Sequence, residues 1–222
     1  MNSSDLLIIF IKAPQKGMVK TRLAAKIGED LALKLYRAMV EDLLENVGVS
    51  DHYDIQIMVM PENSEEEVRN WLKWPGVITS QIVGDLGIKL LHAFEQGFSE
   101  GFKQIIIIGS DLPGLSSSHI KQGFKLLRHY QLVIGPAVDG GYYLIGLNSP
   151  QPQLLTKINW STPEVLPETL NRVHQANLPY YLLEEMRDID EYEDVLALWK
   201  SIKLERKNFL HNSRSVLHEI LK

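Results

Sequence analysis

The sequence predicts one α/β domain whose mainly parallel sheet is covered by helices on both faces. Two continuous apolar runs, Leu6–Ile11 and Ile105–Ile108, lack the polar alternation of a half-exposed strand, which is typical of strands buried on both faces. Amphipathic stretches separate these runs, so strands and helices alternate along the chain. That alternation is typical of parallel sheets with crossover helices.

The remaining elements follow from local patterns. A helix is expected over 28–47, where leucine, methionine or valine recurs every fourth residue. Ser64 and Glu67 have the spacing of a capping box that opens a short helix, and Thr162-Pro163-Glu164 has the composition of a helix start with a side-chain cap. We expect further helices over 87–102, around 120–127, over 191–203 and near 216–221, and further strands at 55–60, 132–134 and 142–147.

Composition narrows the class of protein. The chain has 222 residues, of which 45% are hydrophobic and 23% charged, and it shows no internal repeat or flexible linker, so we expect one domain over 1–222 with a helical extension at 205–222. The net charge of -5 gives no general attraction to nucleic acid or membrane lipid. Without cysteine, thiol catalysis and cysteine-bound zinc are excluded. We expect a cytoplasmic protein, since no signal peptide or anchor is evident.

A basic loop follows the first strand. It contains Lys12, Lys16, Lys20 and Arg22 around Gly17. In open α/β sheets ligands bind outside the carboxyl ends of the strands, and lysine and arginine there can neutralise a polyphosphate. A solvated basic turn is the alternative. The loop is not a Walker A motif, which needs Gly-Lys-Ser/Thr at the start of the helix.

Two further segments, each with an aspartate, also follow predicted strands. Asp111 comes just beyond the strand of four isoleucines, where a carboxylate can hold Mg²⁺ or Mn²⁺ against a diphosphate, although an Asx-turn or helix cap is the alternative. Asp139 precedes Gly140 and Gly141, which is also the pattern of a hairpin turn. Tyr142 and Tyr143 follow and must point to opposite faces of a strand.

Two further segments carry weaker signals. Trp160-Ser161-Thr162 is expected to line a pocket or to cap a helix. Asp188-Ile189-Asp190-Glu191 is expected to supply a carboxylate or to cap the helix that follows. The seven histidines show no metal-ligand spacing, and we assign them no role.

Taken in order, these motifs resemble a known family. The motifs are Lys-x-Pro-x-x-Gly-x-Val-Lys-Thr-Arg-Leu, Gly84-Asp85-Leu86-Gly87, Gly109-Ser110-Asp111-Leu112-Pro113-Gly114-Leu115, Gly135-Pro136-Ala137-x-Asp139-Gly140-Gly141-Tyr142-Tyr143-Leu144, Trp160-Ser161-Thr162 and Asp188-Ile189-Asp190. This set resembles the uncharacterised bacterial glycosyltransferase-A-like family within the nucleotide-diphospho-sugar transferase superfamily. More distantly, it is similar to the 2-phospholactate and molybdenum-cofactor guanylyltransferases.

The resemblance implies a single Rossmann-like GT-A domain with assigned roles for several residues. It implies a nucleotide site at Lys12, Gly17, Lys20, Thr21, Arg22, Asp85, Leu86, Gly87 and Ser110, a metal site for Mg²⁺ or Mn²⁺ at Asp111 and Asp190, and an acceptor site at Asp139, Gly140, Gly141, Tyr142, Trp160 and Thr162. Lys20, Arg22, Asp111 and Asp139 would take part in catalysis. The chain departs from the pattern in having one glycine in its first loop and Ser110-Asp111 in place of Asp-x-Asp.

Three functions follow from this resemblance. Nucleotidyl transfer from an NTP to a small phosphorylated or sugar-like acceptor is favoured, because a leaving pyrophosphate needs the cations of the first loop. Glycosyl transfer from a nucleotide sugar, with Asp139 as the base, is the alternative. A nucleotide-binding protein without catalysis is less favoured, because Asp111, Asp139 and Asp190 are all present. The expected partners are a nucleotide and a small acceptor, with no nucleic acid or membrane, and a homodimer is left open.

Overall fold

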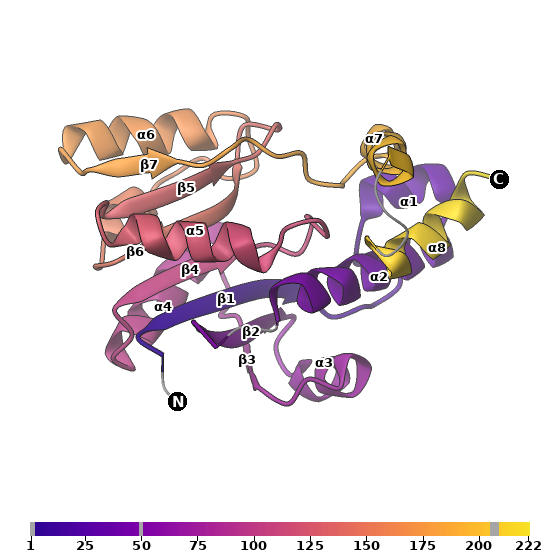
Figure 1. The fold of residues 1–222 in the computed structure, drawn as a ribbon, viewed down its shortest axis with the longest axis horizontal. Helices are drawn as coiled ribbons and strands as arrows, with labels where there is room; N and C mark the ends of the chain where they lie inside the picture. Colours follow the sequence, from indigo (N-terminus) through magenta and orange to yellow (C-terminus); the bar gives the residue numbers. More distant parts are fainter. Residues whose placement is uncertain (1–2, 49–50, 205–208) are drawn as a thin grey trace.

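The computed structural model describes residues 3–48, 51–204 and 209–222. One seven-stranded sheet runs through it in the order β3-β2-β1-β4-β6-β5-β7 (Figure 1). The strands are β1 (Asp5–Lys12), β2 (Asp54–Met60), β3 (Val77–Ser80), β4 (Gln104–Ile108), β5 (Leu132–Pro136), β6 (Tyr142–Leu147) and β7 (Tyr180–Leu182). The helices are α1 (Thr21–Ile27), α2 (Glu29–Val47), α3 (Glu65–Leu72), α4 (Leu86–Ser99), α5 (Ser117–Leu127), α6 (Val165–Gln175), α7 (Tyr192–Leu204) and α8 (His211–Ile220), with a 3₁₀ turn, η1, at Pro152–Leu154.

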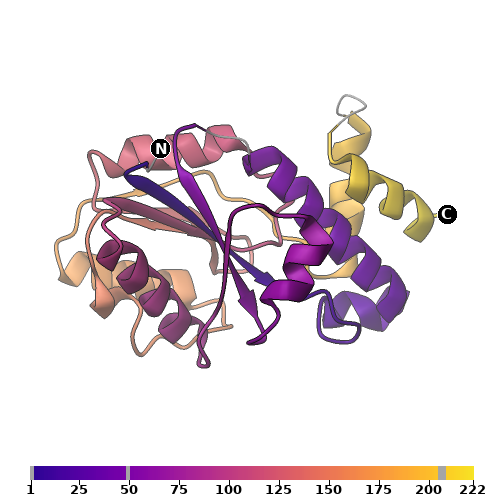
Figure 2. The same cartoon turned by 90° about the horizontal axis from the view of Figure 1, so that it is seen from below.

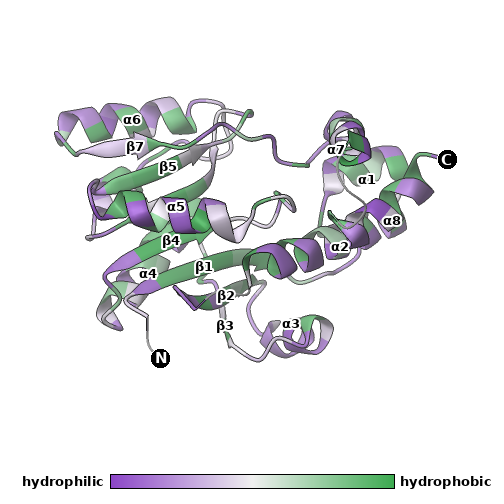
Figure 3. Cartoon of the chain, in the orientation of Figure 1, coloured by the Kyte–Doolittle hydropathy of each residue, from purple (hydrophilic) through white to green (hydrophobic). Residues whose placement is uncertain are grey.

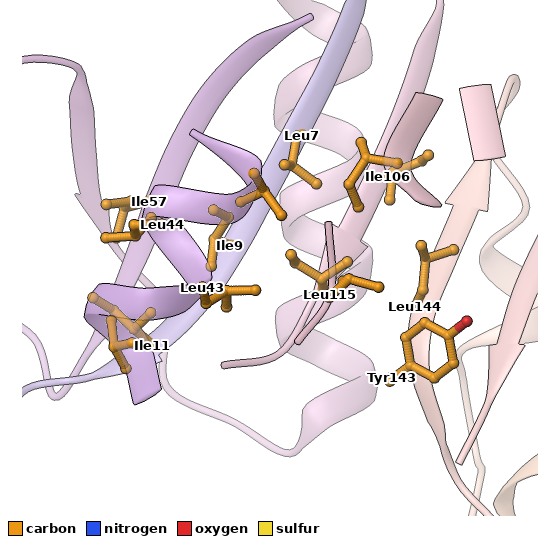
Figure 4. Packing of buried hydrophobic residues seen from close by; sticks show 14 of the residues in the cluster. Leu7, Ile9, Ile11, Leu43, Leu44, Ile57, Ile106, Leu115, Tyr143 and Leu144 are labelled. Atoms are coloured by element: carbon orange, nitrogen blue, oxygen red, sulfur yellow. The ribbon is translucent and has the colours of Figure 1, made fainter. Parts of the chain in front are cut away.

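Apolar residues on both sides of the strands build two cores. On one face, Leu7, Ile9 and Ile11 of β1 pack against α2, α3 and α5 (Figure 4). On the other face, Leu6 and Ile8 belong to one core with residues of α4, η1 and α6. Successive residues of β1 therefore serve opposite cores, which explains why this strand is apolar throughout. Figure 3 shows the central strands mostly in the green of hydrophobic residues, between helices of mixed colour.

A third core joins the two ends of the chain. Leu23 of α1 and Leu35 and Met39 of α2 pack against apolar residues of α7 and α8, and Ile189, in the segment before α7, belongs to the same cluster. The four helices lie together beyond the carboxyl ends of the central strands (Figures 1 and 2). The expected C-terminal extension is thus a packed element, apart from 205–208, which lie outside the described residues.

The fold class predicted from the sequence is confirmed, with one strand reversed. β6 runs antiparallel to both β4 and β5, whereas the other neighbouring strands are parallel. The reason is the short connection from β5 to β6, since a parallel return needs a crossover of a dozen residues or more. No helix in the described part of the chain is long and apolar enough to cross a membrane.

Some local expectations were wrong or incomplete. The short strands β3 and β7, of four and three residues, were not predicted. Ser64 precedes α3 but makes no cap hydrogen bond through its side chain. α6 begins at Val165, and the hydroxyl of Thr162 donates to the carbonyl of Asn159 instead of capping the helix.

Candidate functional site

A cleft of about 850 Å³ opens at the edge of the sheet where β1, β2 and β4 end and β6 begins. The hairpin between β5 and β6, the loop before α6 and the segment before α7 complete its lining. Such an edge is where ligands bind in open α/β sheets. The lining includes four cations, Lys12, Lys20, Arg22 and Lys89, and four carboxylates, Asp111, Asp139, Asp188 and Asp190.

Lys20 is the buried cation of the cleft. It adopts a left-handed backbone conformation, with φ of 49°, directly before α1, and its side chain is only 3% exposed. Its Nζ lies 2.5 Å from Oδ1 of Asp111 and also donates to the carbonyl of Ile189. A left-handed conformation is uncommon outside glycine, and such conformations concentrate at functional sites. Lys20 thus joins the loop after β1, the end of β4 and the segment before α7.

Arg22, in the first turn of α1, makes a second cation–carboxylate pair. Its Nη1 lies 3.1 Å from Oδ2 of Asp190 and 3.9 Å from Oε1 of Glu191. The Arg22 side chain is 68% exposed, so solvent screens this pair and it contributes little to stability. Arg22 can therefore leave Asp190 for a ligand at small cost, unlike the enclosed Lys20.

Tyr36 of α2 holds the start of the basic loop. Its hydroxyl donates to the carbonyl of Lys12 at 2.9 Å and accepts from the amide of Lys12 at 2.8 Å. Burial is the main cause that raises the pKa of Tyr36, so its hydroxyl stays neutral at physiological pH. These bonds fix the backbone of Lys12, whose side chain is exposed at the cleft.

The turn between β5 and β6 carries Asp139 into the cleft. The amide of Gly141 donates to Oδ1 of Asp139 at 2.9 Å, and the amide of Ala137 donates to the carbonyl of Gly141 at 3.0 Å. The hairpin interpretation of this motif is therefore correct, and it does not exclude a role in binding, because Asp139 also lines the cleft. Gly140 allows the turn to approach Pro163 closely, because a Cβ on Gly140 would lie 2.3 Å from the carbonyl oxygen of Pro163.

Asp188 is the carboxylate whose environment is most unfavourable for charge. Burial, and then repulsion from Asp139, raises its pKa to about 6, and Asp111 adds to the repulsion while Lys20 opposes it. Three carboxylates thus share one part of the cleft. Oxygen ligands of this kind are what Mg²⁺ and Mn²⁺ prefer.

Trp160 lines the cleft and contacts the N-terminal part of α4. Its ring meets Tyr142 edge-on, with centroids 6.2 Å apart. A Cβ on Gly87 would lie 2.6 Å from Nε1 of Trp160 and 2.2 Å from the carbonyl oxygen of Leu155. Gly87 therefore allows α4 to pack closely against this segment. Tyr142 and Tyr143 belong to opposite cores, as the alternation of strand side chains requires.

The structure brings most of the predicted site residues together. The cleft is lined by Lys12, Lys20, Arg22, Leu86, Ser110, Asp111, Asp139, Gly141, Tyr142, Trp160, Thr162 and Asp190. Gly17, Thr21, Asp85, Gly87 and Gly140 lie outside that lining. Asp85 instead caps α4, accepting a hydrogen bond from the amide of Ile88 at 2.9 Å.

Tyr36, Gln81 and Lys89 are polar residues of the cleft lining that were not predicted, and tertiary packing brings them there. Gln81 follows the unpredicted strand β3, where the sequence has no clear periodic signal. Lys89 lies in the first turn of α4, where a lysine in an amphipathic pattern is expected to be solvated. Neither Gln81 nor Lys89 has a local signal that distinguishes it from ordinary surface or loop residues.

A second cluster of potential metal ligands lies away from the cleft. Asp42, Glu45 and His211 bring ligand atoms within 4.8 Å of one another. Asp42 already accepts hydrogen bonds from the amides of Asn212 at 3.1 Å and Ser213 at 2.8 Å. Its carboxylate therefore satisfies the first amides of α8, which is a structural role.

The chain is similar to known proteins over most of its length. A model of the family described as "Uncharacterized protein conserved in bacteria (DUF2064)" matches residues 43–162. A 2-phospho-L-lactate guanylyltransferase of Methanocaldococcus jannaschii is 27% identical over 199 residues, covering 88% of this chain and 83% of that protein.

Solved structures share the fold. A protein of Desulfovibrio desulfuricans G20, described as a "putative nucleotide-diphospho-sugar transferase", has a TM-score of 0.90 and 30% identity, with 98% of each chain covered. The Rv0371c protein of Mycobacterium tuberculosis H37Rv, solved in complex with manganese, has a TM-score of 0.54 and 13% identity, with 89% of this chain and 98% of that chain covered.

Proposed function

We propose that this chain, which belongs to the DUF2064 family of proteins conserved in bacteria, is a nucleotidyltransferase. It would transfer a nucleoside monophosphate from an NTP to a small phosphorylated or sugar-like acceptor. The name of its Methanocaldococcus relative supports this reaction class. The observation that carries the proposal is the pairing of Lys20 with Asp111 and of Arg22 with Asp190 inside one cleft.

The reaction takes place between the two substrates and requires no covalent bond to the protein. An acceptor oxygen attacks the α-phosphorus of the NTP, the new P–O bond forms, and the bond to the β-phosphate oxygen breaks so that pyrophosphate leaves. An ionised phosphate acceptor needs no base, whereas a hydroxyl acceptor gives up its proton. The protein positions the two substrates and neutralises the charge that develops on the leaving group. Lys20 and Arg22 are the cations suited to that task.

Asp111 and Asp190 are suited to hold a divalent metal ion. Oδ1 of Asp111 is occupied by Lys20, while Oδ2 accepts no hydrogen bond from the described residues, and the side chain is 47% exposed. Both groups offer the hard oxygen donors that Mg²⁺ and Mn²⁺ bind. When bound, such an ion would neutralise phosphate charge as a Lewis acid. The manganese complex of a protein with the same fold is consistent with this choice.

The two ion pairs would respond differently to the nucleotide. Lys20 is held by two partners in a buried position, so we expect it to stay in place and to orient Asp111. Arg22 is exposed, and its pairs with Asp190 and Glu191 are open to solvent, so we expect it to move from Asp190 to a phosphate. That movement would free Asp190 for the metal without leaving either charge unpaired.

Glycosyl transfer is the second candidate, and the name of the Desulfovibrio structure favours it. Asp139 would then act as the base toward an acceptor hydroxyl. Its Oδ1 is engaged by the amide of Gly141, which leaves Oδ2 for that role. We expect Asp139→Asn to lower the catalytic rate under glycosyl transfer and the acceptor affinity under nucleotidyl transfer.

A thermal-shift screen separates these candidates. The probes are GTP, ATP, CTP and UTP, and the nucleotide sugars UDP-glucose and GDP-mannose, each with and without Mn²⁺. We expect an NTP with Mn²⁺ to raise the Tm, and Asp111→Asn to remove the dependence on metal. Arg22→Ala should weaken nucleotide binding by roughly 1.5–3 kcal/mol, whereas Lys16→Ala should weaken it less, because Lys16 is a solvated surface charge. Stabilisation by a nucleotide sugar alone would favour glycosyl transfer instead.

A further inference from the structure

Gln81 is a buried side chain of the cleft that uses only half of its hydrogen-bonding capacity. It is 6% exposed, and its Nε2 donates to the carbonyls of Met58 at 2.8 Å and Ile11 at 3.3 Å. Because both partners are acceptors, they determine which end of the amide is nitrogen. Oε1 receives no hydrogen bond from the described part of the chain, and Gln81 lines the cleft. An ordered acceptor is thus available to a ligand.

Lys89 places a cation on the same side of the cleft. Its Nζ lies 3.4 Å from Sδ of Met60, and no carboxylate among the described residues lies within ion-pair distance of it. Burial, followed by repulsion from Lys12, lowers its pKa. Lys89 is therefore a half-buried donor without a counterion, whereas Lys20 and Arg22 both have one.

The sheet register brings Gln81 and Lys89 to one place. Lys12 is the β1 partner of Met60, and the amide of Gln81 bonds to the carbonyl of Val59 at 2.8 Å, which continues the pairing of β3 with β2. Gln81 therefore lies beside Met60, the residue that Lys89 contacts. Apolar side chains of Phe10, Leu86 and Leu90 line the same cleft. The cleft therefore combines apolar side chains with one free acceptor and one free donor.

We propose that Gln81 and Lys89 recognise the base of the nucleotide and select guanine over adenine. This inference rests on the proposed nucleotidyl transfer and adds the base to it. An apolar surface suits the face of a base. Guanine offers N1–H and its 2-amino group as donors to Oε1 of Gln81, and O6 and N7 as acceptors for Nζ of Lys89. Adenine has an amino group in place of O6, which would turn a donor toward the lysine.

Binding measurements test this selection. The probes are GTP and ATP with Mg²⁺, titrated calorimetrically into the full-length protein and two variants. We expect the wild type to bind GTP at least about tenfold more tightly than ATP. Lys89→Met should reduce that ratio to near one by weakening GTP. Lys12→Met is the matched control: it removes a neighbouring cation, so it should weaken both nucleotides equally and preserve the ratio.

Gln81→Leu provides an independent measurement. Its Nε2 also ties two strands together, so the variant is judged by its GTP-to-ATP ratio, which a smaller folded fraction does not change. A GTP-to-ATP affinity ratio that falls toward one in Gln81→Leu supports the proposal. A wild type without preference for GTP, or a Lys89→Met variant that loses both nucleotides equally, would overturn guanine selection while leaving nucleotidyl transfer intact. A wild type that binds neither nucleotide would overturn both.

Discussion

At the scale of single residues, Lys20 does two things at once. Its ammonium neutralises Asp111 and holds Ile189 of the segment before α7, from a position that is almost closed to solvent. Charge-assisted hydrogen bonds in such places contribute more to stability than exposed ion pairs. The same residue therefore shapes the cleft and supplies charge to it.

Replacing Lys20 by methionine should lower both stability and nucleotide affinity. We expect the free energy of unfolding, measured in urea, to fall by about 2 kcal/mol, because a charged donor to two acceptors is lost. Lys16→Met is the control, since its pair with Asp30 is exposed on both sides and screened by solvent, so its loss should lower the free energy of unfolding less. Equal losses of unfolding free energy in the two variants would show that the buried contacts of Lys20 do not stabilise the fold.

Asp188 gives a pH-dependent prediction at the same scale. Its pKa is raised from 3.8 to about 6 in the folded protein, so its charged form costs stability above pH 6, and the cost disappears as the pH falls from about 6 to about 4. Asp188→Asn should then stabilise the metal-free protein by about 1 kcal/mol at pH 8, after allowance for solvent screening. At pH 4 the two proteins should unfold at the same urea concentration. A stabilisation that persists at pH 4 would have another cause.

At the scale of elements, α4 positions one side of the cleft. Its N-terminus approaches the segment 155–160 so closely that only glycine fits at position 87. The same helix carries Leu86 and Lys89 into the cleft lining. The seating of α4 thus sets where these side chains lie.

Gly87→Ala should disturb that seating. The added methyl group would collide with the Leu155 carbonyl and the Trp160 ring, so we expect a loss of about 1–3 kcal/mol in unfolding free energy. Gly109→Ala is a matched control, because a Cβ there meets nothing within 4 Å. Tryptophan fluorescence should change in the first variant only. An unchanged Tm for Gly87→Ala would mean that α4 can shift without cost.

At the scale of the whole molecule, the C-terminal helices are connected to the cleft through Ile189. α7 and α8 share a core with α1 and α2, and Ile189, whose carbonyl binds Lys20, belongs to that core. The beginning and the end of the chain therefore depend on each other. Loosening α8 is expected to reach the cleft through Ile189.

Leu217→Ala tests this dependence. Leu217 is 0% exposed, so its truncation should cost about 2–5 kcal/mol in unfolding free energy and weaken nucleotide binding. Leu204→Ala, at an 89% exposed position, should change neither property. If Leu217→Ala lowers stability while the folded fraction binds nucleotide as tightly as the wild type, the third core does not support the cleft.

Those parts of the protein that depend on local pattern could be predicted from the sequence. Continuous apolar runs can only be buried on both faces, so β1 and β4 and the α/β class were predictable. The loops after those strands were also predictable as binding loops, because the carboxyl ends of parallel strands share one edge. The ordered motifs added the family, which the matches to known proteins confirm.

Which of these residues come into contact could not be predicted from the sequence. Lys20 and Asp111 are 91 residues apart in sequence, and Lys20 and the Ile189 carbonyl are 169 apart, distances over which no local pattern carries information. The same holds for Gln81 and Lys89, whose surroundings come from the packing of α4 against β1 and β2. Local sequence sets the conformation of each segment. Which charge finds a partner, and which remains free for a ligand, depends on burial and distance in the folded chain.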